Sequence, residues 1–302
     1  MLKAIIFGFN GQDGYYLKNL LSQLKINVFT SSRSNSDYNG DISDTDFVQT
    51  LIKKIEPDYI FNFAAVSSVS HEYFSENKKA ILDGTINILE SCRLFSKKSK
   101  IFISGSALQF KNYGIPINEF NDFDPSSIYS VFRINSVHIS RYYREQIGLK
   151  VYIGYLFNHD SPFRLDNHIN QKILRVVKSI NDGNNVKLAL GDINAQKEFG
   201  FAGDIVQAIW ILVNQDKIFE TVIGTGLAYS IKDWLDISFN FIKKNWEDYI
   251  VIDNSYKSPY KVLVSDPKTI FGMNWKPEVN IEELCLLMWK SINDKNDKGP
   301  FC

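Results

Sequence analysis

The sequence has few of the residues that build disulfide frameworks or metal centres. It contains three cysteines, Cys92, Cys285 and Cys302, and their spacing fits neither a set of disulfides nor a zinc site. Its four histidines are scattered, so we predict that the protein holds no metal. Such cysteine usage is typical of a reducing compartment, and we therefore expect a cytoplasmic protein.

An excess of charge and long apolar runs are also missing. The 34 basic residues equal the 34 acidic ones, and a net charge of zero favours neither nucleic acid nor an anionic membrane as a partner. No apolar run is long enough to span a bilayer, and because the first predicted strand begins at Lys3, we expect no signal peptide. The chain does have 302 residues, of which 44% are hydrophobic, and this is enough for a large core.

The stretch from Lys3 to Arg33 carries the clearest pattern. An apolar run at 4–7 leads into a glycine turn at 8–14, and a helical leucine pattern and a second apolar run at 26–30 follow. This order predicts a β-α-β unit with a right-handed crossover. Glycines at such a turn let a pyrophosphate approach the helix N-terminus, where free N–H groups favour negative charge. The stretch therefore predicts a dinucleotide site, although the G-x-x-G-x-x-G spacing alone also fits an ordinary tight turn.

The end of the second predicted strand decides which dinucleotide is expected. NAD sites usually place Asp or Glu there to bind the ribose 2′-hydroxyl, whereas NADP sites place Arg near the 2′-phosphate. Here Arg33 lies between Ser32 and Ser34, and the first acid is Asp37. We therefore predict NADP as the cofactor in preference to NAD, with Arg33 and the serine hydroxyls as phosphate partners. The alternative is an arginine that is merely solvated in a polar loop.

The rest of the chain keeps alternating helix and strand, which predicts an α/β fold of the Rossmann type, a doubly wound parallel sheet covered by helices on both faces. Because the composition turns polar after residue 157, we expect residues 1–157 to bind NADP. Residues 158–302 should form mostly a smaller C-terminal substrate-binding lobe, with a strand at 221–224 returning to the sheet and a frayed tail at 293–302. The other predicted strands lie at 59–64, 100–104, 151–156 and 186–190, and the predicted helices at 44–54, 76–95, 128–147, 170–181, 203–213, 231–243 and 281–292.

Two pairs of polar residues could carry chemistry. Tyr129 and Arg133 lie four residues apart and so share one face of a predicted helix. A cation beside a tyrosine hydroxyl favours the phenolate and hence proton transfer. Ser104 and Ser106 end the preceding strand at the carboxyl edge of the sheet, where ligands bind. From the residues alone, a solvated arginine near a packed tyrosine and serines that only cap the strand end fit at least as well.

Longer blocks of sequence resemble a known family. The most specific are Phe-Asn-His-Asp-Ser-Pro at 157–162 and Gly-Asp-Ile-Asn-Ala-Gln-Lys at 191–197, and GFNGQDGYYL, YNGDISD, PDYIFNFAA, IGTG and FGMNWKP support them. On these blocks the chain resembles the extended short-chain dehydrogenases/reductases and, within that group, is most similar to the GDP-mannose 4,6-dehydratase family, over about residues 3–290.

The resemblance implies roles for particular residues. Tyr129 falls on the family's catalytic tyrosine, and Tyr129 and Arg133 are both expected to contact the cofactor. The other implied cofactor-binding residues are Gly8, Asn10, Gly11, Gln12, Asp13, Gly14, Arg33, Asp41, Ile42, Asn62, Ala64 and Ala65. The implied substrate-binding residues are Asn158, Arg164, Lys172 and Lys197. The positive charge of the two lysines suits a diphosphate, although plain surface lysines are the alternative.

The chain also departs from the family. Arg133 stands where the family has lysine, and its planar guanidinium is larger than an ammonium group. Gly105 stands where the family has its catalytic threonine, and Ala107 stands at the position of the glutamate that serves as the base during dehydration. Alanine cannot take a proton. In addition, residues 258–262 read Ser-Pro-Tyr-Lys-Val instead of Arg-Pro-x-Glu-Val, so we expect base or phosphate recognition to differ.

Three hypotheses follow. The first is an NADP(H)-dependent oxidoreductase that acts at C4 of a GDP-linked sugar in the synthesis of deoxysugar or polysaccharide precursors, with Tyr129 as acid or base, Arg133 beside it and Ser104 or Ser106 orienting the sugar oxygen. The second is a GDP-mannose or GDP-heptose 4,6-dehydratase with a relocated base. The third is a non-catalytic protein that binds dinucleotide or nucleotide sugar. The expected partners are a GDP-linked nucleotide sugar and further copies of the chain, in a homodimer or homotetramer.

Overall fold

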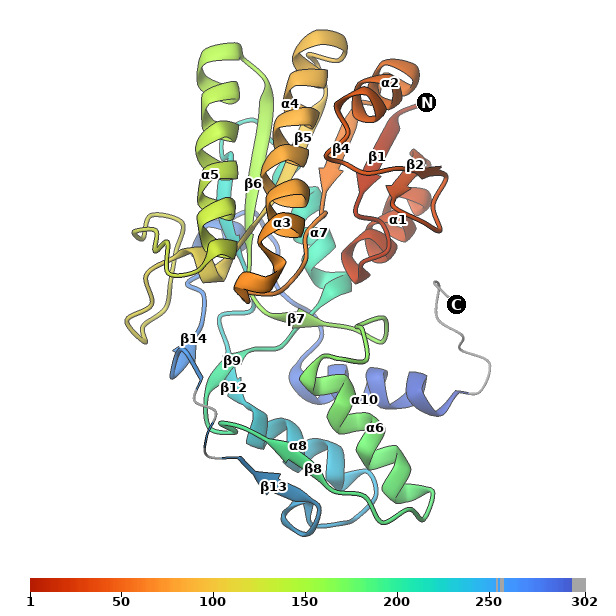
Figure 1. Cartoon of the computed structure of the whole chain (residues 1–302), viewed down its shortest axis with the longest axis vertical. Coiled ribbons are helices and arrows are strands. Elements are labelled where there is room, and N and C mark those ends of the chain that lie inside the picture. Colours follow the sequence, from red (N-terminus) through yellow and green to blue (C-terminus); the bar gives the residue numbers. More distant parts are fainter. Residues whose placement is uncertain (254, 256–257, 295–302) are drawn as a thin grey trace.

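The computed structural model describes residues 1–253, 255 and 258–294, so Cys302 and most of the predicted frayed tail lie outside the described residues. Two lobes are stacked along the long axis of the molecule (Figure 1). The described part of the upper lobe holds a seven-stranded parallel sheet in the order β11-β6-β5-β4-β1-β2-β3. Its strands are β1 (Lys3–Phe7), β2 (Asn27–Ser32), β3 (Tyr38–Asn39), β4 (Tyr59–Asn62), β5 (Lys100–Ser106), β6 (Lys150–Leu156) and β11 (Glu220–Ile223).

The helices of the upper lobe form where one face of each can be buried. Helix α1 (Gln12–Gln23) places Leu17 and Leu21 in the core, and neither residue is exposed. Helix α2 (Thr45–Ile55) begins after Asp44, whose carboxylate accepts a hydrogen bond from the N–H of Phe47. Such a cap satisfies a backbone donor that the first turn of a helix leaves without a partner.

The helix predicted at 76–95 is divided into three parts. Helix α3 (Phe74–Asn77) continues as a π-helical turn (Lys78–Asp83) and then as α4 (Gly84–Phe95). Similarly, α5 (Ile128–Tyr142) ends in a π-helical turn (Tyr143–Ile147). The prediction of single regular helices was wrong in this respect, because hydrophobic spacing does not distinguish a π turn from an α turn. π-Helical turns are often found beside functional sites.

The lower lobe has a core of its own. Helices α6 (Ile169–Asn181), α8 (Ile231–Asn240) and α10 (Ile281–Asn293) enclose fully buried side chains that include Leu174, Trp234 and Leu284. Short strands pair around this core. They are β7 (His159–Asp160) with β10 (Gly200–Phe201), β8 (Leu188–Leu190) with β13 (Ile250–Ile252), and β9 (Gln196–Glu198) with both β12 (Ala228–Ser230) and β14 (Val262–Leu263), and a short helix α9 (Lys268–Phe271) follows.

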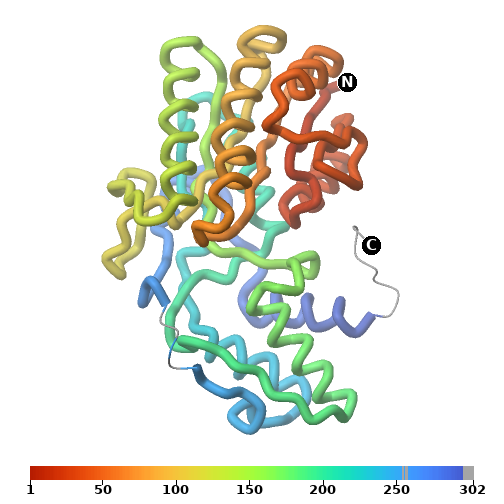
Figure 2. The backbone as a smooth tube through the Cα atoms, viewed as in Figure 1, coloured from red at the N-terminus to blue at the C-terminus, as the bar shows by residue number. Residues whose placement is uncertain are grey.

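The chain passes between the lobes more than once. Figure 2 shows it leaving the upper lobe after β6 and re-entering that lobe through α7 (Ala202–Val213) and β11. Helix α7 packs against α1 in one core, which contains Ile205, Ile209, Leu17 and Leu21. The predicted Rossmann-type sheet with a smaller second lobe is therefore confirmed. Within the described residues, none of the helices has the length and apolar character needed to cross a membrane.

A buried carboxylate joins segments of the lower lobe to the end of β11. Glu198 is fully buried and accepts hydrogen bonds from the N–H of Ser265 (2.6 Å) and of Gly226 (3.3 Å). It also accepts hydrogen bonds from both the N–H and the hydroxyl of Thr225. Burial raises the pKa of Glu198, while these donors oppose the shift. Because the carboxylate has several donors, it holds β9, the turn after β11 and the chain after β14 together.

Candidate active site

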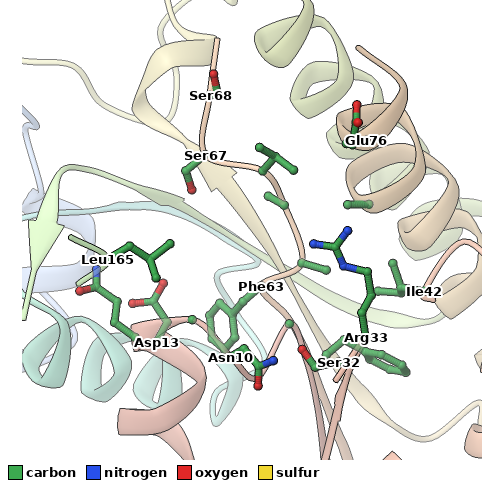
Figure 3. Close-up of a pocket in the computed structure, with 18 of the residues that line it drawn as sticks. Asn10, Asp13, Ser32, Arg33, Ile42, Phe63, Ser67, Ser68, Glu76 and Leu165 are labelled. Carbon is green, nitrogen blue, oxygen red and sulfur yellow. The ribbon is translucent and has the colours of Figure 1, made fainter. Parts of the chain in front are cut away.

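A cleft of about 820 Å³ lies at the carboxyl ends of β1, β2 and β4. Because β1 lies between β2 and β4, the chain leaves the sheet in opposite directions on its two sides, and ligands of open α/β sheets bind at such a switch point. Figure 3 shows Arg33 reaching into the cleft from the end of β2, with Asp13 and Asn10 beside the glycine turn. The sequence-predicted residues that line the cleft are Gly8, Asn10, Gly11, Gln12, Asp13, Arg33, Asp41, Ile42, Ala64, Ala65 and Arg164.

The glycine turn has the close approaches that require glycine. Gly8 has φ of +76°, and a Cβ atom there would lie 2.6 Å from the backbone nitrogen of Ala64. A Cβ atom on Gly14 would lie 2.6 Å from the carbonyl oxygen of Phe9. Helix α1 begins after Gly11, which provides no side-chain cap. The first N–H groups of the helix are therefore available to an anion in the cleft.

Polar groups surround the far end of β2. The side-chain amide of Asn10 donates to the carbonyl of Ser34 (2.8 Å). The buried oxygen of Asn10 and the hydroxyl of Ser31 have no hydrogen-bond partner in the part of the chain that the structure describes. Asp37 accepts hydrogen bonds from the N–H and hydroxyl of Thr30 (2.9 and 2.8 Å) and does not line the cleft. The first acid after β2 is thus used within its own loop, and Arg33 lines the cleft instead.

A second cation and an acid lie near Arg33. The N–H and hydroxyl of Ser43 donate to Asp41, and together with the charges of Lys79 and Arg33 they hold the pKa of Asp41 below its ordinary value. Lys79, from the π-helical turn, also lines the cleft. Asn62 lies under this region and accepts a hydrogen bond from the N–H of Ala64 (3.0 Å).

Tyr129 and Arg133 do lie together, as their spacing on α5 predicts. The Nε–H of Arg133 donates to the Tyr129 hydroxyl (3.1 Å), and a second nitrogen of Arg133 donates to the hydroxyl of Ser104 (3.0 Å) and to its carbonyl oxygen. All three residues are buried, and they do not line the cleft. The Tyr129 ring instead belongs to an apolar cluster against which Ala65 packs, and Ala65 does line the cleft.

The segment after Ser104 carries two of the departures from the family pattern, Gly105 and Ala107. A Cβ atom on Gly105 would lie 2.6 Å from the ring of Tyr155, whose hydroxyl donates to Glu220 (2.7 Å). The hydroxyl of Ser106 accepts a hydrogen bond from the N–H of Leu108 (3.2 Å) and so caps a short 3₁₀ helix (Ala107–Gln109). Ala107 itself is buried in an apolar cluster. The two serines are therefore engaged in internal contacts.

Carboxylates are present in the cleft, on the first turn of α1, after β3 and on α3, and α3 packs against α5. Among the described residues, the acids that line it are Asp13, Asp41 and Glu76. Asp13 contacts His159, with 2.9 Å between the carboxylate and Nε2. None of the three belongs to β5 or α5, which carry Ser104 and Tyr129.

The predicted substrate residues form a cationic region at the start of the lower lobe. Arg164 lines the cleft and lies 3.1 Å from the carboxylate of Asp160. His168 also lines the cleft, and burial together with the charges of Arg164, Lys197 and Lys172 lowers its pKa to about 4. Lys172, Lys197 and Asn158 do not line the cleft.

The sequence did not point to three further residues of the site. Lys79 and His168 line the cleft, and His159 contacts Asp13 beside it. His159 belongs to the Phe-Asn-His-Asp-Ser-Pro block, and its presence in a specific block was a usable signal. Lys79 and His168 lie outside the quoted blocks, and only the folded chain brings them to the cleft.

Comparisons with known proteins agree with this geometry. A family model described as GDP-mannose 4,6 dehydratase matches residues 5–288. GDP-mannose 4,6 dehydratase 1 of Arabidopsis thaliana is 32% identical over 319 residues, which cover 94% of this chain and 88% of that protein. GDP-mannose 4,6-dehydratase of Yersinia enterocolitica is 30% identical over 347 residues, which cover 95% of this chain and 93% of that protein.

Solved structures share the fold at low sequence identity. RMD from Pseudomonas aeruginosa, complexed with NADPH, has a TM-score of 0.85 at 18% identity and covers 96% of this chain and 98% of that one. dTDP-glucose 4,6-dehydratase from Bacillus anthracis, in complex with NAD, has a TM-score of 0.83 at 16% identity, with 97% and 98% covered. Because one of these structures holds NADPH and the other NAD, they do not decide between the two cofactors.

Proposed function

The chain belongs to the GDP-mannose 4,6-dehydratase family, and from this premise we propose that it is an NADP(H)-dependent enzyme that acts at C4 of a GDP-linked hexose. The observation that carries the proposal is the pairing of a dinucleotide-type cleft with a tyrosine hydroxyl that a buried cation holds at 3.1 Å. We further expect a cytoplasmic homodimer or homotetramer that serves the synthesis of deoxysugar or polysaccharide precursors.

The residues of the cleft fit a dinucleotide. The side-chain position at Gly11 is open toward a ligand, because a Cβ atom there would meet only the carbonyl oxygen of Gly8, at 3.5 Å. Asn10 and Ser31 offer polar atoms that have no hydrogen-bond partner among the described residues. Arg33 is the residue we propose for the 2′-phosphate, since arginine pairs well with phosphate oxygens. When bound, the nicotinamide accepts or donates hydride.

The protein must itself move the proton of the sugar hydroxyl. Tyr129 is our candidate, because the guanidinium of Arg133 donates to its hydroxyl and holds it in place for proton transfer. Ser104 fixes that guanidinium through two contacts and so acts on Tyr129 through Arg133. Ala65 lines the cleft and packs against the cluster that contains Tyr129, and we propose that the segment around Ala65 shifts on binding so that Tyr129 reaches the sugar.

The family reaction, 4,6-dehydration, is the first candidate reaction. It needs a base for the C5 proton while water leaves C6, and Ala107 cannot be that base. A relocated base would have to come from the cleft carboxylates Asp13, Asp41 and Glu76, which lie on other elements.

A second candidate is C4 oxidation or reduction without loss of water, and the position of Ala107 in an apolar cluster favours it. This reaction needs hydride transfer and one proton carrier, and Tyr129 suffices for that. The carboxylate of Glu220 binds the hydroxyl of Tyr155 in this cluster, but it is already paired with Arg141 and Arg144, so we expect it to be a poor base for elimination.

Mass spectrometry of the nucleotide-sugar products distinguishes these reactions. The protein is incubated with GDP-mannose, a GDP-heptose or GDP-4-keto-6-deoxymannose, together with NADP⁺ or NADPH, and with the UDP-linked hexose as a control for the base. Loss of one water from a GDP sugar supports 4,6-dehydration, and a change of two hydrogens supports C4 redox chemistry. If neither change occurs while NADP still binds, the protein is a binder and the enzymatic proposal is wrong.

A further inference from the structure

Two consecutive residues of the cofactor turn bind the loop that begins the lower lobe. The side-chain amide of Gln12 donates to the carbonyl of His159 (3.1 Å), and the hydroxyl of Ser161 donates to the side-chain oxygen of Gln12 (2.8 Å). His159 Nε2 lies 2.9 Å from the carboxylate of Asp13. We call these four residues, Gln12, Asp13, His159 and Ser161, the latch. It joins segments almost 150 positions apart in the sequence, so it forms only in the folded chain.

The latch is buried enough for its hydrogen bonds to matter. Ser161 is fully buried and Gln12 is 5% exposed, while the side chains of His159 and Asp13 are 10% and 17% exposed. Removing one partner from a buried hydrogen bond leaves the other without water or protein to replace it. A substitution in the latch should therefore affect ligand binding on both sides of the cleft.

The geometry around His159 fixes its charge. Its Nδ1 lies 2.7 Å from the carbonyl oxygen of Phe157, and its Nε2 faces the carboxylate of Asp13. Because a carbonyl oxygen and an ionised carboxylate only accept hydrogen bonds, these contacts favour a hydrogen on each ring nitrogen, that is, the imidazolium form. Although burial and the nearby charge of Arg164 lower the pKa of His159, Asp13 and the two hydrogen bonds outweigh them and raise it.

This charge has a consequence for the cofactor turn. Asp13 lies in the first turn of α1 and lines the cleft, where the phosphates of a dinucleotide would bind. An unpaired carboxylate there would repel the phosphates. The imidazolium of His159 neutralises Asp13 and thereby keeps the helix N-terminus suitable for an anion.

The other side of the latch leads to the cationic region. The loop continues from Ser161 to Arg164 and His168, which both line the cleft. Its Phe163 ring packs against Tyr15 of α1, with 4.2 Å between ring centroids. Strand β7, which contains His159, pairs with β10. Lys197 lies three residues before the start of β10. Ordering the cofactor turn should therefore also order the residues that face the nucleotide sugar.

We propose that the latch couples the two ligand sites. A bound dinucleotide increases the affinity for the GDP moiety of the sugar, and bound GDP increases the affinity for the dinucleotide. His159 is a positioning residue in this coupling. The identity of the two ligands rests on the proposed function, but the coupling rests on the contacts described above. Because coupling between two sites is reciprocal, each ligand must change the affinity of the other by the same factor.

Calorimetry on the full chain measures this factor directly. NADP⁺ is titrated with and without saturating GDP, and GDP is titrated with and without saturating NADP⁺. We expect each bound ligand to increase the affinity for the other by about fivefold or more, which is the lower range of measured couplings. If the wild-type protein binds both ligands with no coupling, the latch proposal alone is wrong. If it binds no dinucleotide, the proposed function is wrong as well.

Variants then assign the coupling to the latch. His159→Gln removes the charge, so NADP⁺ affinity should fall about tenfold, as expected for a lost charge-assisted contact, and the coupling factor should approach one. In His159→Gln with Asp13→Asn, the repulsion is gone, so most of the NADP⁺ affinity should return while the coupling stays lost. His138→Gln is the matched control, because His138 is exposed on α5. Coupling that survives in His159→Gln would overturn the proposal.

Two further measurements separate this role from a merely structural one. Ser161→Ala removes the hydroxyl that donates to Gln12 and accepts a hydrogen bond from the N–H of Phe163 (3.2 Å). It should reduce the coupling without unfolding the chain, which thermal melting checks. Nuclear magnetic resonance of the His159 ring should find both nitrogens protonated above the ordinary pKa of 6.5, with Asp13 and Arg164 as the charged groups that face the ring. The coupling should fall as the pH rises through that raised pKa. A ring that is neutral below pH 6.5 would contradict the assignment.

Discussion

The two ends of the site differ in how closely they follow the family. At the end that we propose for the cofactor, Gly8, Arg33 and Asp41 match the family pattern in sequence and line an open cleft. At the catalytic end, Arg133, Gly105 and Ala107 replace the expected residues. There the side chains are buried and bonded to one another, and none of these three residues lines the cleft.

The difference has a physical cause. The cofactor end depends on backbone approach, as at Gly8, where any side chain would collide with the backbone after β4. The catalytic end depends on a few side chains, and neighbours such as Tyr155 can fill the space that a smaller residue leaves. Side chains at a strand end can thus be exchanged without altering the sheet, whereas the glycine turn cannot.

The largest expected effect tests whether the catalytic end still works. Tyr129→Phe removes the hydroxyl that Arg133 contacts, and turnover should fall by about 10²–10⁴-fold because the proton carrier is lost. NADP⁺ affinity should change little, since Tyr129 does not line the cleft. Steady-state kinetics and calorimetry measure the two quantities. Tyr142→Phe, at an exposed position on the same helix, is the control. Near-normal turnover in Tyr129→Phe would remove Tyr129 from the mechanism.

The second prediction concerns the support behind the catalytic end. Glu220 binds Arg141 (2.6 Å), Arg144 (2.7 Å) and the Tyr155 hydroxyl (2.7 Å), and its side chain is 14% exposed. Glu220→Gln should lower the free energy of unfolding by about 3 kcal/mol, because two partly buried guanidinium groups lose their partner. Chemical denaturation measures the change. Glu145→Gln, which removes an exposed partner of Arg144, should cost under about 0.5 kcal/mol.

The difference in stability between wild type and Glu220→Gln should depend on pH. Burial raises the pKa of Glu220, but the hydrogen bonds from Arg141, Tyr155 and Arg144 outweigh it and lower the pKa to about 2. A lowered carboxyl pKa gives stability that is complete above the ordinary value of 4.5 and is lost as the pH falls towards 2. The difference between wild type and Glu220→Gln should therefore shrink over that range. A constant difference would mean that the charge of Glu220 is not what stabilises the cluster.

The third prediction tests the cofactor end. Arg33→Ala should weaken NADP⁺ binding by about 10- to 100-fold, the range for losing hydrogen bonds to a charged group. NAD⁺ binding should be almost unchanged, because NAD lacks the 2′-phosphate. Calorimetry with both dinucleotides is the measurement, and Arg93→Ala, which affects only a surface pair with Glu90, is the control. Equal losses for the two dinucleotides would place Arg33 away from the phosphate.

Sequence alone predicted the fold of the β-α-β unit better than the packing around Ser104 and Tyr129. The β-α-β unit follows from local patterns, since apolar runs, glycine spacing and helical periodicity are all read from neighbouring residues. The spacing of Tyr129 and Arg133 likewise predicted their contact, because both lie on one helix. Strands of two or three residues, such as β7 and β10, were not predicted, because they are too short to show alternation.

What the sequence could not reveal depends on contacts between distant segments. Nothing near Gly105 indicates that Tyr155 of the neighbouring strand fills the space beside it. Tyr129 and Ala65 are far apart in the sequence, and only the folded chain packs Ala65 against the apolar cluster of Tyr129. His159 and Asp13 are 146 positions apart, so their contact required the folded chain.

The smallest expected effect tests whether the ring of Tyr155 fills the space beside Gly105 or leaves it open. Gly105→Thr should lower the free energy of unfolding by about 1–2 kcal/mol, because its Cβ would meet the ring of Tyr155 at 2.6 Å and force it to move. In a Tyr155→Leu background, the same substitution should cost almost nothing, because the ring is absent. A double-mutant cycle by chemical denaturation measures this coupling. If Gly105→Thr is tolerated equally in both backgrounds, the space is open, and the missing threonine alone would separate this part of the site from the family pattern.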